Sequence, residues 1–322
     1  MSKPLKNERI LLITPRYFNY EIYIKDYLEK TGHQVYVIYE NIDEISIKCK
    51  VAKRLGKYEN YSNEYFKNQI GKKRFDTVLA IRASSLSAEV IEHIKINSPN
   101  AKLFLYQWDS VKNNPNAITI APYFDKVSTF DLNDADKYGW NYRPLFYINA
   151  SQRLGVRKYD IAYICSLHSK RVNILYELKK LKCNKYLYIY SKFSHFIKEK
   201  YLTKNEAFLN VSYEDVNFKP LSLDKVNTIM SESNIVVDYT HPNQTGFTMR
   251  TCEALGNRCK LATNNKLVVN ADFYNENNVY IYDPDNFAIP DSFIKSPFLD
   301  LDKKIYERYS ISCWLKDILD YE

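Results

Sequence analysis

The polar residues with the most informative spacing lie in the segment 238–256, which reads DYTHPNQTGFTMRTCEALG. Gly246, Arg250 and Glu253 stand at i, i+4 and i+7, a spacing that predicts one shared face of a helix. On such a face an arginine can donate two hydrogen bonds to phosphate oxygens, and a carboxylate can accept two from a ribose diol. Thr245 is placed to cap this helix, and the free N–H groups at a helix start attract anions. The segment therefore predicts a cradle for a nucleotide diphosphate, and the alternative is an exposed helix with an ordinary Arg–Glu pair.

A second basic loop, SLHSKR, contains Lys170 and Arg171 directly before a predicted helix. Their side chains and the backbone N–H groups could meet a diphosphate there. The alternative is a pair of solvated cations, although a cation at a helix start opposes the helix dipole. His168 in the same loop is typical of a solvated side chain. His241 and Asn243, in the loop of the first segment, could reach a sugar that the diphosphate carries.

In the first half of the chain, Asp109 directly follows the apolar run 102–108. A carboxylate at the end of a buried strand can accept a proton from a hydroxyl as a general base. The alternative is that Asp109 caps the following turn. Arg82 follows another apolar run, and Arg16 and Tyr17 follow the first one, so we expect all of them at the same edge of a sheet.

Short apolar runs that alternate with helical patterns must position these residues. In the first half, we expect strands at 9–14, 34–39, 77–81, 102–108 and 126–130, and helices near 20–30 and 87–95. Asp131 is expected to cap a short helix over 132–137, and this use favours a structural role for it. Repeated alternation of strand and helix predicts a parallel sheet with helices on both faces.

The same alternation restarts after about residue 157. We expect strands at 159–165, 186–190, 234–238, 259–263 and 278–282, and helices at 169–180, 221–231 (capped by Ser222), 247–255 and 305–319. The predicted organisation is an N-terminal α/β domain at 1–150, a second α/β domain at 151–302, and a helix at 303–322 that packs back toward the first domain. Ligands of open α/β sheets bind at the carboxyl ends of the strands, so a cleft between two such domains is the expected site.

Composition excludes several classes of function. The chain has 46 Lys+Arg and 38 Asp+Glu, a net charge of +8 that would suit an anionic lipid surface or a phosphorylated ligand. No RNA-binding motif accompanies the charge, so no nucleic acid partner is expected. Only 7 glycines occur, without GxGxxG or GxxxxGK[ST], and the 6 cysteines form no CxxC pair, so neither a glycine-rich phosphate loop nor a metal site is expected. No apolar run of about 20 residues and no apolar signal core is present, and a cytoplasmic location is predicted.

The run TGFTMRTCEALG at 245–256, followed by NRCKLATN at 257–264, resembles the donor-binding signature of GT-B glycosyltransferases. That signature has an acidic residue, a Gly-Phe-Gly-like turn, a second Glu eight positions later, a small residue and a strand. The motif covers about 238–264, and the alternation of the whole chain is similar to the family's two Rossmann-like domains, which face a central cleft. With the QWDS run at 107–110, the chain resembles glycosyltransferases of lipopolysaccharide and capsular polysaccharide biosynthesis.

This resemblance implies roles for the residues that match the motif. Glu253 would hold the donor ribose and Arg250 the donor phosphates, with Lys170 and Arg171 facing the same phosphates. Thr245 stands where the family has the acidic residue that faces the transferred sugar. This departure leaves open the identity of the sugar and the stereochemical outcome.

The implied activity is transfer of a sugar from a nucleotide-sugar, with UDP as the expected base, to a hydroxyl of a surface glycan or lipid-linked oligosaccharide. Asp109 would be the base, and Arg16, Tyr17 and Arg82 would lie on the acceptor side. No metal or other cofactor is expected, because the family neutralises the leaving diphosphate with a helix N-terminus and cations. The protein would work at the inner face of an anionic membrane.

Two other functions remain open. A sugar-nucleotide epimerase can share this fold, but it would need further carboxylates and histidines, and the chain has 5 histidines in all. A non-catalytic nucleotide- or carbohydrate-binding module would bind ligand without releasing free nucleotide, so a turnover assay separates it from an enzyme.

Overall fold

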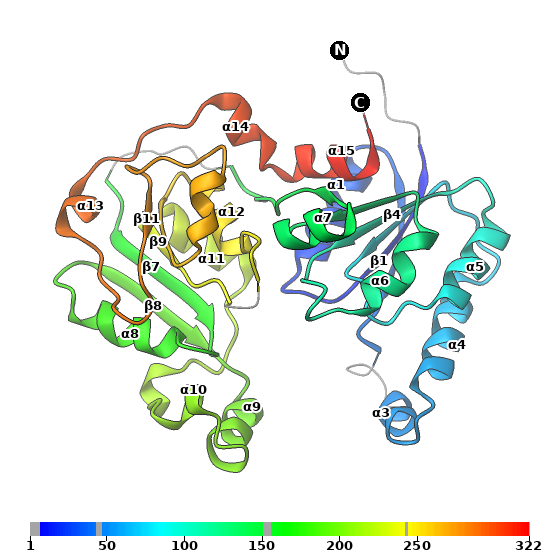
Figure 1. Cartoon of the computed structure of the whole chain (residues 1–322), viewed down its shortest axis with the longest axis horizontal. Coiled ribbons are helices and arrows are strands. Elements are labelled where there is room, and N and C mark those ends of the chain that lie inside the picture. The colour runs from blue at the N-terminus through cyan, green and yellow to red at the C-terminus, as the bar shows by residue number, and fades with distance from the viewer. Residues whose placement is uncertain (1–6, 43–46, 151–155, 242–243, 322) are drawn as a thin grey trace. The chain divides into compact units, whose positions relative to one another are not determined.

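The computed structural model describes residues 7–42, 47–150, 156–241 and 244–321. These residues form two compact units, each built on one parallel β-sheet (Figure 1). The first unit comprises the described residues up to Pro144 together with those from Ile311 onward, and the second comprises those within Leu145–Ser310.

The first unit has a six-stranded sheet in the order β2-β1-β3-β4-β5-β6. The strands are β1 (Arg9–Thr14), β2 (Gln34–Tyr39), β3 (Thr77–Ile81), β4 (Lys102–Gln107), β5 (Lys126–Thr129) and β6 (Asn141–Tyr142). The helices are α1 (Tyr20–Lys30), α3 (Ile47–Arg54), α4 (Tyr58–Ile70), α5 (Ala88–Asn97), α6 (Asn116–Ile120), α7 (Leu132–Tyr138) and α15 (Ile311–Leu319). The continuous apolar runs of β1 and β3 are buried because helices cover both faces of the sheet.

The order of the strands places a switch point in this sheet. β1 pairs in parallel with β2 on one side and with β3 on the other, so successive connections leave β1 in opposite directions. At such a point the loops after neighbouring strands separate and leave room for a ligand at the carboxyl edge. The loops after β1, β2, β3 and β4 therefore lie at this edge.

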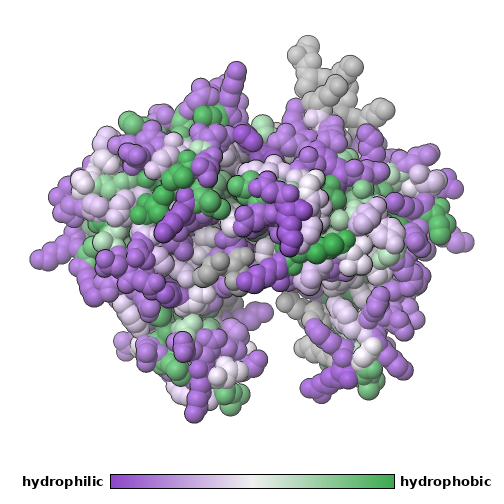
Figure 2. Space-filling view, viewed as in Figure 1, coloured by the Kyte–Doolittle hydropathy of each residue, from purple (hydrophilic) through white to green (hydrophobic). Residues whose placement is uncertain are grey.

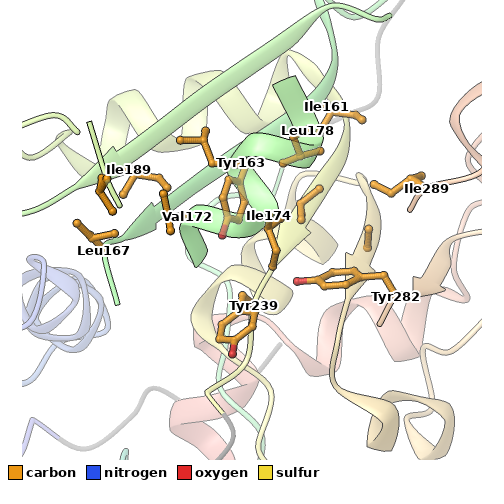
Figure 3. Close-up of a cluster of buried hydrophobic side chains, with 14 of the residues drawn as sticks. Ile161, Tyr163, Leu167, Val172, Ile174, Leu178, Ile189, Tyr239, Tyr282 and Ile289 are labelled. Atoms are coloured by element: carbon orange, nitrogen blue, oxygen red, sulfur yellow. The ribbon is translucent and has the colours of Figure 1, made fainter. Parts of the chain in front are cut away.

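The second unit has a five-stranded sheet in the order β11-β10-β9-β7-β8. The strands are β7 (Tyr159–Ser166), β8 (Lys185–Tyr190), β9 (Ser233–Asp238), β10 (Lys260–Thr263) and β11 (Val279–Ile281). The α-helices are α8 (Arg171–Lys180), α9 (Phe193–Ile197), α10 (Glu206–Leu209), α11 (Leu223–Ser231), α12 (Met249–Gly256), α13 (Asp291–Lys295) and α14 (Lys303–Arg308). A core cluster under α8 joins Tyr163 of β7 to Ile174 and Leu178 of the helix (Figure 3).

The predicted strands agree with the observed ones to within a residue or two at each end. β1 and β3 are buried apolar runs, whereas the edge strands β2 and β8 are mostly half-buried. Ser222 caps α11 by accepting a hydrogen bond from the N–H of Lys225, and Asp131 caps α7 through the N–H of Asp134, as expected. The helices α3, α4, α6, α9, α10 and α13 were not predicted. On the face shown in Figure 2, hydrophilic side chains predominate and apolar ones form small separate areas.

The prediction of one helix over 305–319 is wrong, because two separate helices, α14 and α15, occupy this region. The carbonyl of Tyr309 accepts a hydrogen bond from the N–H of Tyr147 at 2.7 Å, and Tyr147 forms a β-bridge with Ser310. These contacts remove the Tyr309 carbonyl from helical pairing. α15 then packs within the first unit, where Trp314 is fully buried with its ring centroid 4.7 Å from that of Tyr106.

Gly256 closes α12 against the first residues of the second unit. A Cβ on Gly256 would lie 2.6 Å from the Cβ of Tyr147 and 2.8 Å from the carbonyl oxygen of Asn149. Only a residue without a side chain permits this approach. Within the described part of the chain, no helix has both the length and the apolar character needed to cross a membrane.

Candidate functional site

The carboxyl edge of the second sheet gathers a buried carboxylate and two guanidinium groups. Asp238 ends β9 with 4% of its surface exposed, and burial raises the pKa of its carboxyl group. The positive charges of Arg171 and Arg250 lower the same pKa and so oppose the effect of burial. The hydroxyl of Thr251 donates to Asp238 Oδ2 at 3.2 Å. This carboxylate therefore links the end of β9 to the first turns of α8 and α12.

Arg250 and Glu253 form an ion pair on α12, with 2.5 Å between Arg250 Nη1 and Glu253 Oε2. The Arg–Glu pair that the sequence offered as an alternative is thus present. The exposed helix that this alternative assumed is wrong, since the Glu253 side chain is only 3% exposed. The Arg250 side chain is 20% exposed, so the guanidinium can reach a ligand while the carboxylate holds it in place.

The start of α12 differs from the prediction. Thr248, and not Thr245, is the N-cap, with its hydroxyl oxygen accepting from the N–H of Thr251 at 3.3 Å. Gly246 therefore precedes the helix and does not share a helical face with the two charged residues. Asn265 donates from Nδ2 to the carbonyls of Thr245 at 3.1 Å and Gly246 at 3.4 Å, which keeps both in a loop.

Lys170 and Arg171 occupy different surroundings. Arg171 donates to the carbonyl of Ser166 at 3.1 Å and to that of Tyr239 at 2.9 Å, so its guanidinium joins the ends of β7 and β9. Lys170 instead pairs with Asp285 at the surface, and this hydrogen bond raises its pKa. The geometry gives Arg171 a role in holding the loops, whereas Lys170 is accessible.

Two histidines approach each other over the same edge. The rings of His168 and His241 have centroids 5.7 Å apart, and His168 Nδ1 lies 3.1 Å from the hydroxyl of Ser169. Burial, with Arg171 and His241 nearby, lowers the pKa of His168 to about 3, so its ring is neutral at neutral pH. This half-buried side chain differs from the solvated one expected. Asn243 lies outside the described residues.

The first unit has a polar pocket of about 380 Å³ at its own carboxyl edge, and its main carboxylate, Glu40, was not among the predicted site residues. The lining residues come from the loops after β2 and β3 and from α3 and α4: Glu40, Asn41, Lys53, Tyr58, Arg82, Ser84 and Ser85. Glu40 directly follows β2, so the signal that selected Asp109 after β4 was present here too.

Arg82 enters this pocket from a strained backbone. Arg82 and Ala83 have φ angles of 64° and 55°, in the left-handed region that costs energy for residues other than glycine. Gln107 and Asn114 donate to the carbonyl of Arg82 at 3.1 and 2.6 Å and hold the turn. Such strain persists where the surrounding structure enforces it, and it is frequent at functional sites.

Glu40 is 1% exposed, and burial raises its pKa to about 7 against the opposing effects of Arg82, Ser84 and Ser85. Its Oε2 accepts from the N–H of Ser85 at 3.3 Å. Its Oε1 lies 3.7 Å from Arg82 Nη1 and accepts no hydrogen bond from the residues that the structure describes. At neutral pH this carboxyl group can therefore both give and take a proton.

Asp109 makes the turn contacts that were expected as the alternative to a general base. Its Oδ1 accepts from the N–H of Ser110 at 3.0 Å and from Asn113 Nδ2 at 2.9 Å, which is the capping alternative. Its Oδ2 lies 3.8 Å from Arg82 Nε, so Arg82 stands between Asp109 and Glu40.

Arg16 and Tyr17 follow β1 at the same edge of this sheet. The guanidinium of Arg16 lies over the ring of Tyr39 at 4.4 Å, and the backbone N–H of Arg16 donates to Asn41 Oδ1 at 2.6 Å. Tyr17 is 47% exposed and packs edge-on against Trp108. Across residues 7–42, 47–150, 156–241 and 244–321, no cluster of three or more His, Cys, Asp or Glu could hold a metal ion.

No protein-family model and no curated protein matches the sequence. Solved structures do match. The complex of S. aureus MnaA with UDP has a TM-score of 0.52 at 10% identity, over 98% of both chains. A UDP-GlcNAc 2-epimerase from Methanocaldococcus jannaschii with UDP-GlcNAc and UDP has a TM-score of 0.48 at 12% identity, over 98% of this chain and 100% of that one. The glycotransferase of kitacinnamycin also has a TM-score of 0.48, at 9% identity, over 98% of this chain and 96% of that one.

At these identities the likeness concerns the fold. Each unit is Rossmann-like, with a parallel sheet and helices on both faces. The expected α/β fold class is confirmed, and the chain has the two-unit architecture called GT-B.

Proposed function

We propose that this protein is a glycosyltransferase that moves a sugar from a nucleotide-sugar donor to a hydroxyl group of a glycan acceptor. The observation that carries the proposal is the Arg250–Glu253 pair on α12, beside the buried Asp238 at the carboxyl edge of the second sheet. This arrangement offers a positive group for phosphate, and the buried carboxylate of Glu253 holds that group in place.

In the proposed reaction the acceptor oxygen attacks the anomeric carbon of the donor sugar. The bond between that carbon and the diphosphate oxygen breaks, and the nucleoside diphosphate leaves with the bonding electrons. Arg250, one fifth exposed, would balance the charge that develops on the diphosphate without a metal ion. The acceptor proton would pass to a carboxylate, for which Asp109 remains our proposal because its Oδ2 faces Arg82.

UDP is the nucleotide we propose for the donor. The structure of S. aureus MnaA, whose fold is similar, was determined with UDP, which makes UDP the first nucleotide to try. Lys170 and His241 lie on loops at the same edge as Arg250 and would contact the diphosphate or the sugar. Surface glycans or lipid-linked oligosaccharides remain the proposed acceptors, with peripheral contact to an anionic membrane.

The first test is calorimetric titration of the whole protein with UDP, GDP, ADP and CMP in the presence of EDTA. We expect one nucleotide to bind and Arg250→Ala to abolish the binding. Arg308→Ala is the matched control, because Arg308 pairs with Asp272 at the surface of the same unit. Absence of binding for all four nucleotides, or equal binding by Arg250→Ala, would refute the proposed donor site.

A second test addresses chemistry. Hydrolytic release of UDP from a UDP-sugar can be followed without knowing the acceptor. We expect Asp109→Asn to bind UDP as the wild type does and to release it at least tenfold more slowly, within the range of general-base effects. Unchanged release would remove Asp109 from the site.

The second candidate is a sugar-nucleotide epimerase, and the observation that favours it is Glu40. An epimerase needs a group that exchanges protons near neutral pH, and the pKa of Glu40 is raised to about 7. An epimerase would convert UDP-GlcNAc to its C2 epimer without an acceptor. Accumulation of that epimer in NMR spectra would favour this function over transfer.

A further inference from the structure

The pocket beside Arg82 has the chemistry of a saccharide site. We propose that it binds a sugar through neighbouring hydroxyl groups, with Glu40 accepting hydrogen bonds from them and Arg82 donating hydrogen bonds to them. The proposal deepens the proposed function by assigning an acceptor subsite, but its binding test does not depend on transfer.

Glu40 and Arg82 both have unused hydrogen-bonding capacity within the described residues. The two carboxylate oxygens nearest to the Arg82 guanidinium lie 3.7 and 3.8 Å away, beyond hydrogen-bond distance. Glu40 Oε1 likewise accepts no hydrogen bond within the described residues and is buried. A buried acceptor without a donor is costly, and a ligand hydroxyl placed between the two groups would satisfy both.

The pocket has charges of both signs around it. Glu40 and Asp109 on either side of Arg82 disfavour an anion, whereas Arg82 and Lys53 disfavour a cation. A neutral ligand with many hydroxyl groups fits this mixture. The hydroxyls of Ser84, Ser85 and Tyr58 add further polar partners, and about 380 Å³ is large enough for a monosaccharide unit.

The turn at Arg82 is strained. Its left-handed φ of 64° is unfavourable for a residue other than glycine. The strain fixes the direction in which the guanidinium leaves the backbone. The paired amides of Gln107 and Asn114 hold that direction.

Saturation-transfer NMR tests this assignment with methyl glycosides of glucose, galactose, mannose and N-acetylglucosamine as probes. We expect transfer to at least one glycoside, and at least a fivefold loss of signal for Glu40→Gln. Glu89→Gln is the matched control, since Glu89 is 59% exposed on the same unit. Arg82→Lys, at a partly exposed position, covers the case in which Glu40→Gln fails to fold.

No transfer to any of the glycosides, or full transfer in folded Glu40→Gln or Arg82→Lys, would overturn the saccharide site. UDP binding in the second unit is measured separately. Absence of UDP binding would contradict the proposed donor site and would leave the result on glycoside binding unaffected.

A separate observation concerns α3, whose apolar residues face solvent. Ile47 is 81% exposed, Val51 50% and Leu55, just after the helix, 65%. Their spacing of four residues aligns them on one side of the helix axis. Cys49, on the opposite side, is fully buried and attaches α3 to the core of the first unit.

Cations flank this apolar stripe. Lys48 and Arg54 lie on either side of it in the helical spacing, and Lys57 follows the helix. α3 carries no acidic residue. We infer that α3 docks this unit on an anionic lipid surface, with the apolar stripe in the headgroup boundary and the cations on lipid phosphates.

Co-sedimentation with vesicles of equimolar phosphatidylglycerol and phosphatidylcholine tests the docking. We expect the wild type to sediment and Ile47→Ser to lose about tenfold in affinity, the effect of one exposed isoleucine that enters an apolar phase. Ile96→Ser is a close control, because Ile96 is 79% exposed on α5 of the same unit. Wild type that stays in solution, or equal sedimentation of both variants, would overturn the inference. Pure phosphatidylcholine vesicles show whether the lipid charge is required, and binding that is equal with and without phosphatidylglycerol would refute its electrostatic part.

Discussion

Because the turn at Arg82 is strained, we predict that glycine at this position gives a more stable protein than alanine, the reverse of their usual order of stability. Arg82→Ala and Arg82→Gly lose the same guanidinium and the same contacts with Glu40 and Asp109. They differ in backbone only. Alanine pays about 1–2 kcal/mol for the left-handed φ, and glycine does not. Glycine loses about 0.4–1 kcal/mol more through the entropy of the unfolded chain. Arg82→Gly should therefore be the more stable by about 0.8 kcal/mol.

Urea unfolding followed by tryptophan fluorescence measures this difference in the relevant unit. All 3 tryptophans, Trp108, Trp140 and Trp314, belong to the first unit, so their emission reports its unfolding. With a denaturant slope of about 2 kcal/mol/M, the midpoints should differ by about 0.4 M.

A matched pair at Glu92 is the control for the unfolded state. Glu92 is exposed within α5, where glycine should be less stable than alanine by about 1 kcal/mol. If Arg82→Ala proves as stable as Arg82→Gly or more so, the turn is not strained, and the argument from stored strain to function fails.

Three further predictions concern the two sites and the packing of the second unit. Glu253→Gln should weaken UDP binding about 10- to 100-fold, because it removes the charged hydrogen bond that holds Arg250 and such bonds contribute about 1.5–3 kcal/mol, and unchanged calorimetric affinity in folded protein would contradict this positioning role. The pKa of Glu40 is higher in the folded protein than its usual 4.5, so the folded state binds more protons between the two values and unfolding free energy should fall by about 3 kcal/mol as pH rises from about 4.5 to 7. Glu40→Gln should flatten that part of the curve, and an equally steep curve in the variant would assign the effect to another group. Gly256→Ala should destabilise the second unit by about 1–3 kcal/mol, since the new Cβ would lie 2.6 Å from the Cβ of Tyr147. Thermal unfolding followed by circular dichroism measures this loss, and an unchanged midpoint would mean that the helix shifts to accommodate the methyl group.

The central strands were predictable because burial on both faces leaves a continuous apolar run in the sequence, and the half-buried edge strands β2 and β8 because β-branched and aromatic residues dominate them. β1, β2 and β3 have the expected bounds, every later strand that was predicted lies within a residue or two of its predicted run, and the two-residue strand β6 was not predicted. α3 was not predictable in the same way, because its apolar residues face water and so give no sign of packing.

The candidate sites depended on contacts that no local pattern encodes. The segment before α12 contains several threonines that could cap a helix, and Asn265, which follows β10, keeps Thr245 in the loop so that Thr248 becomes the cap. Glu40 was missed although it directly follows β2, whereas its burial depends on Arg82 and Ser85, which lie in the loop after a different strand.

The ends of the second unit bear on how such a protein can be built and divided. Its first residues pair with its last, since Tyr147 donates to the Tyr309 carbonyl and forms a bridge with Ser310. The unit is therefore an insertion whose entry and exit lie side by side, while α15 returns the chain to the first unit. Domains with adjacent ends tolerate insertion and excision well. Genetic recombination could therefore replace this unit as a whole without changes to the surrounding chain.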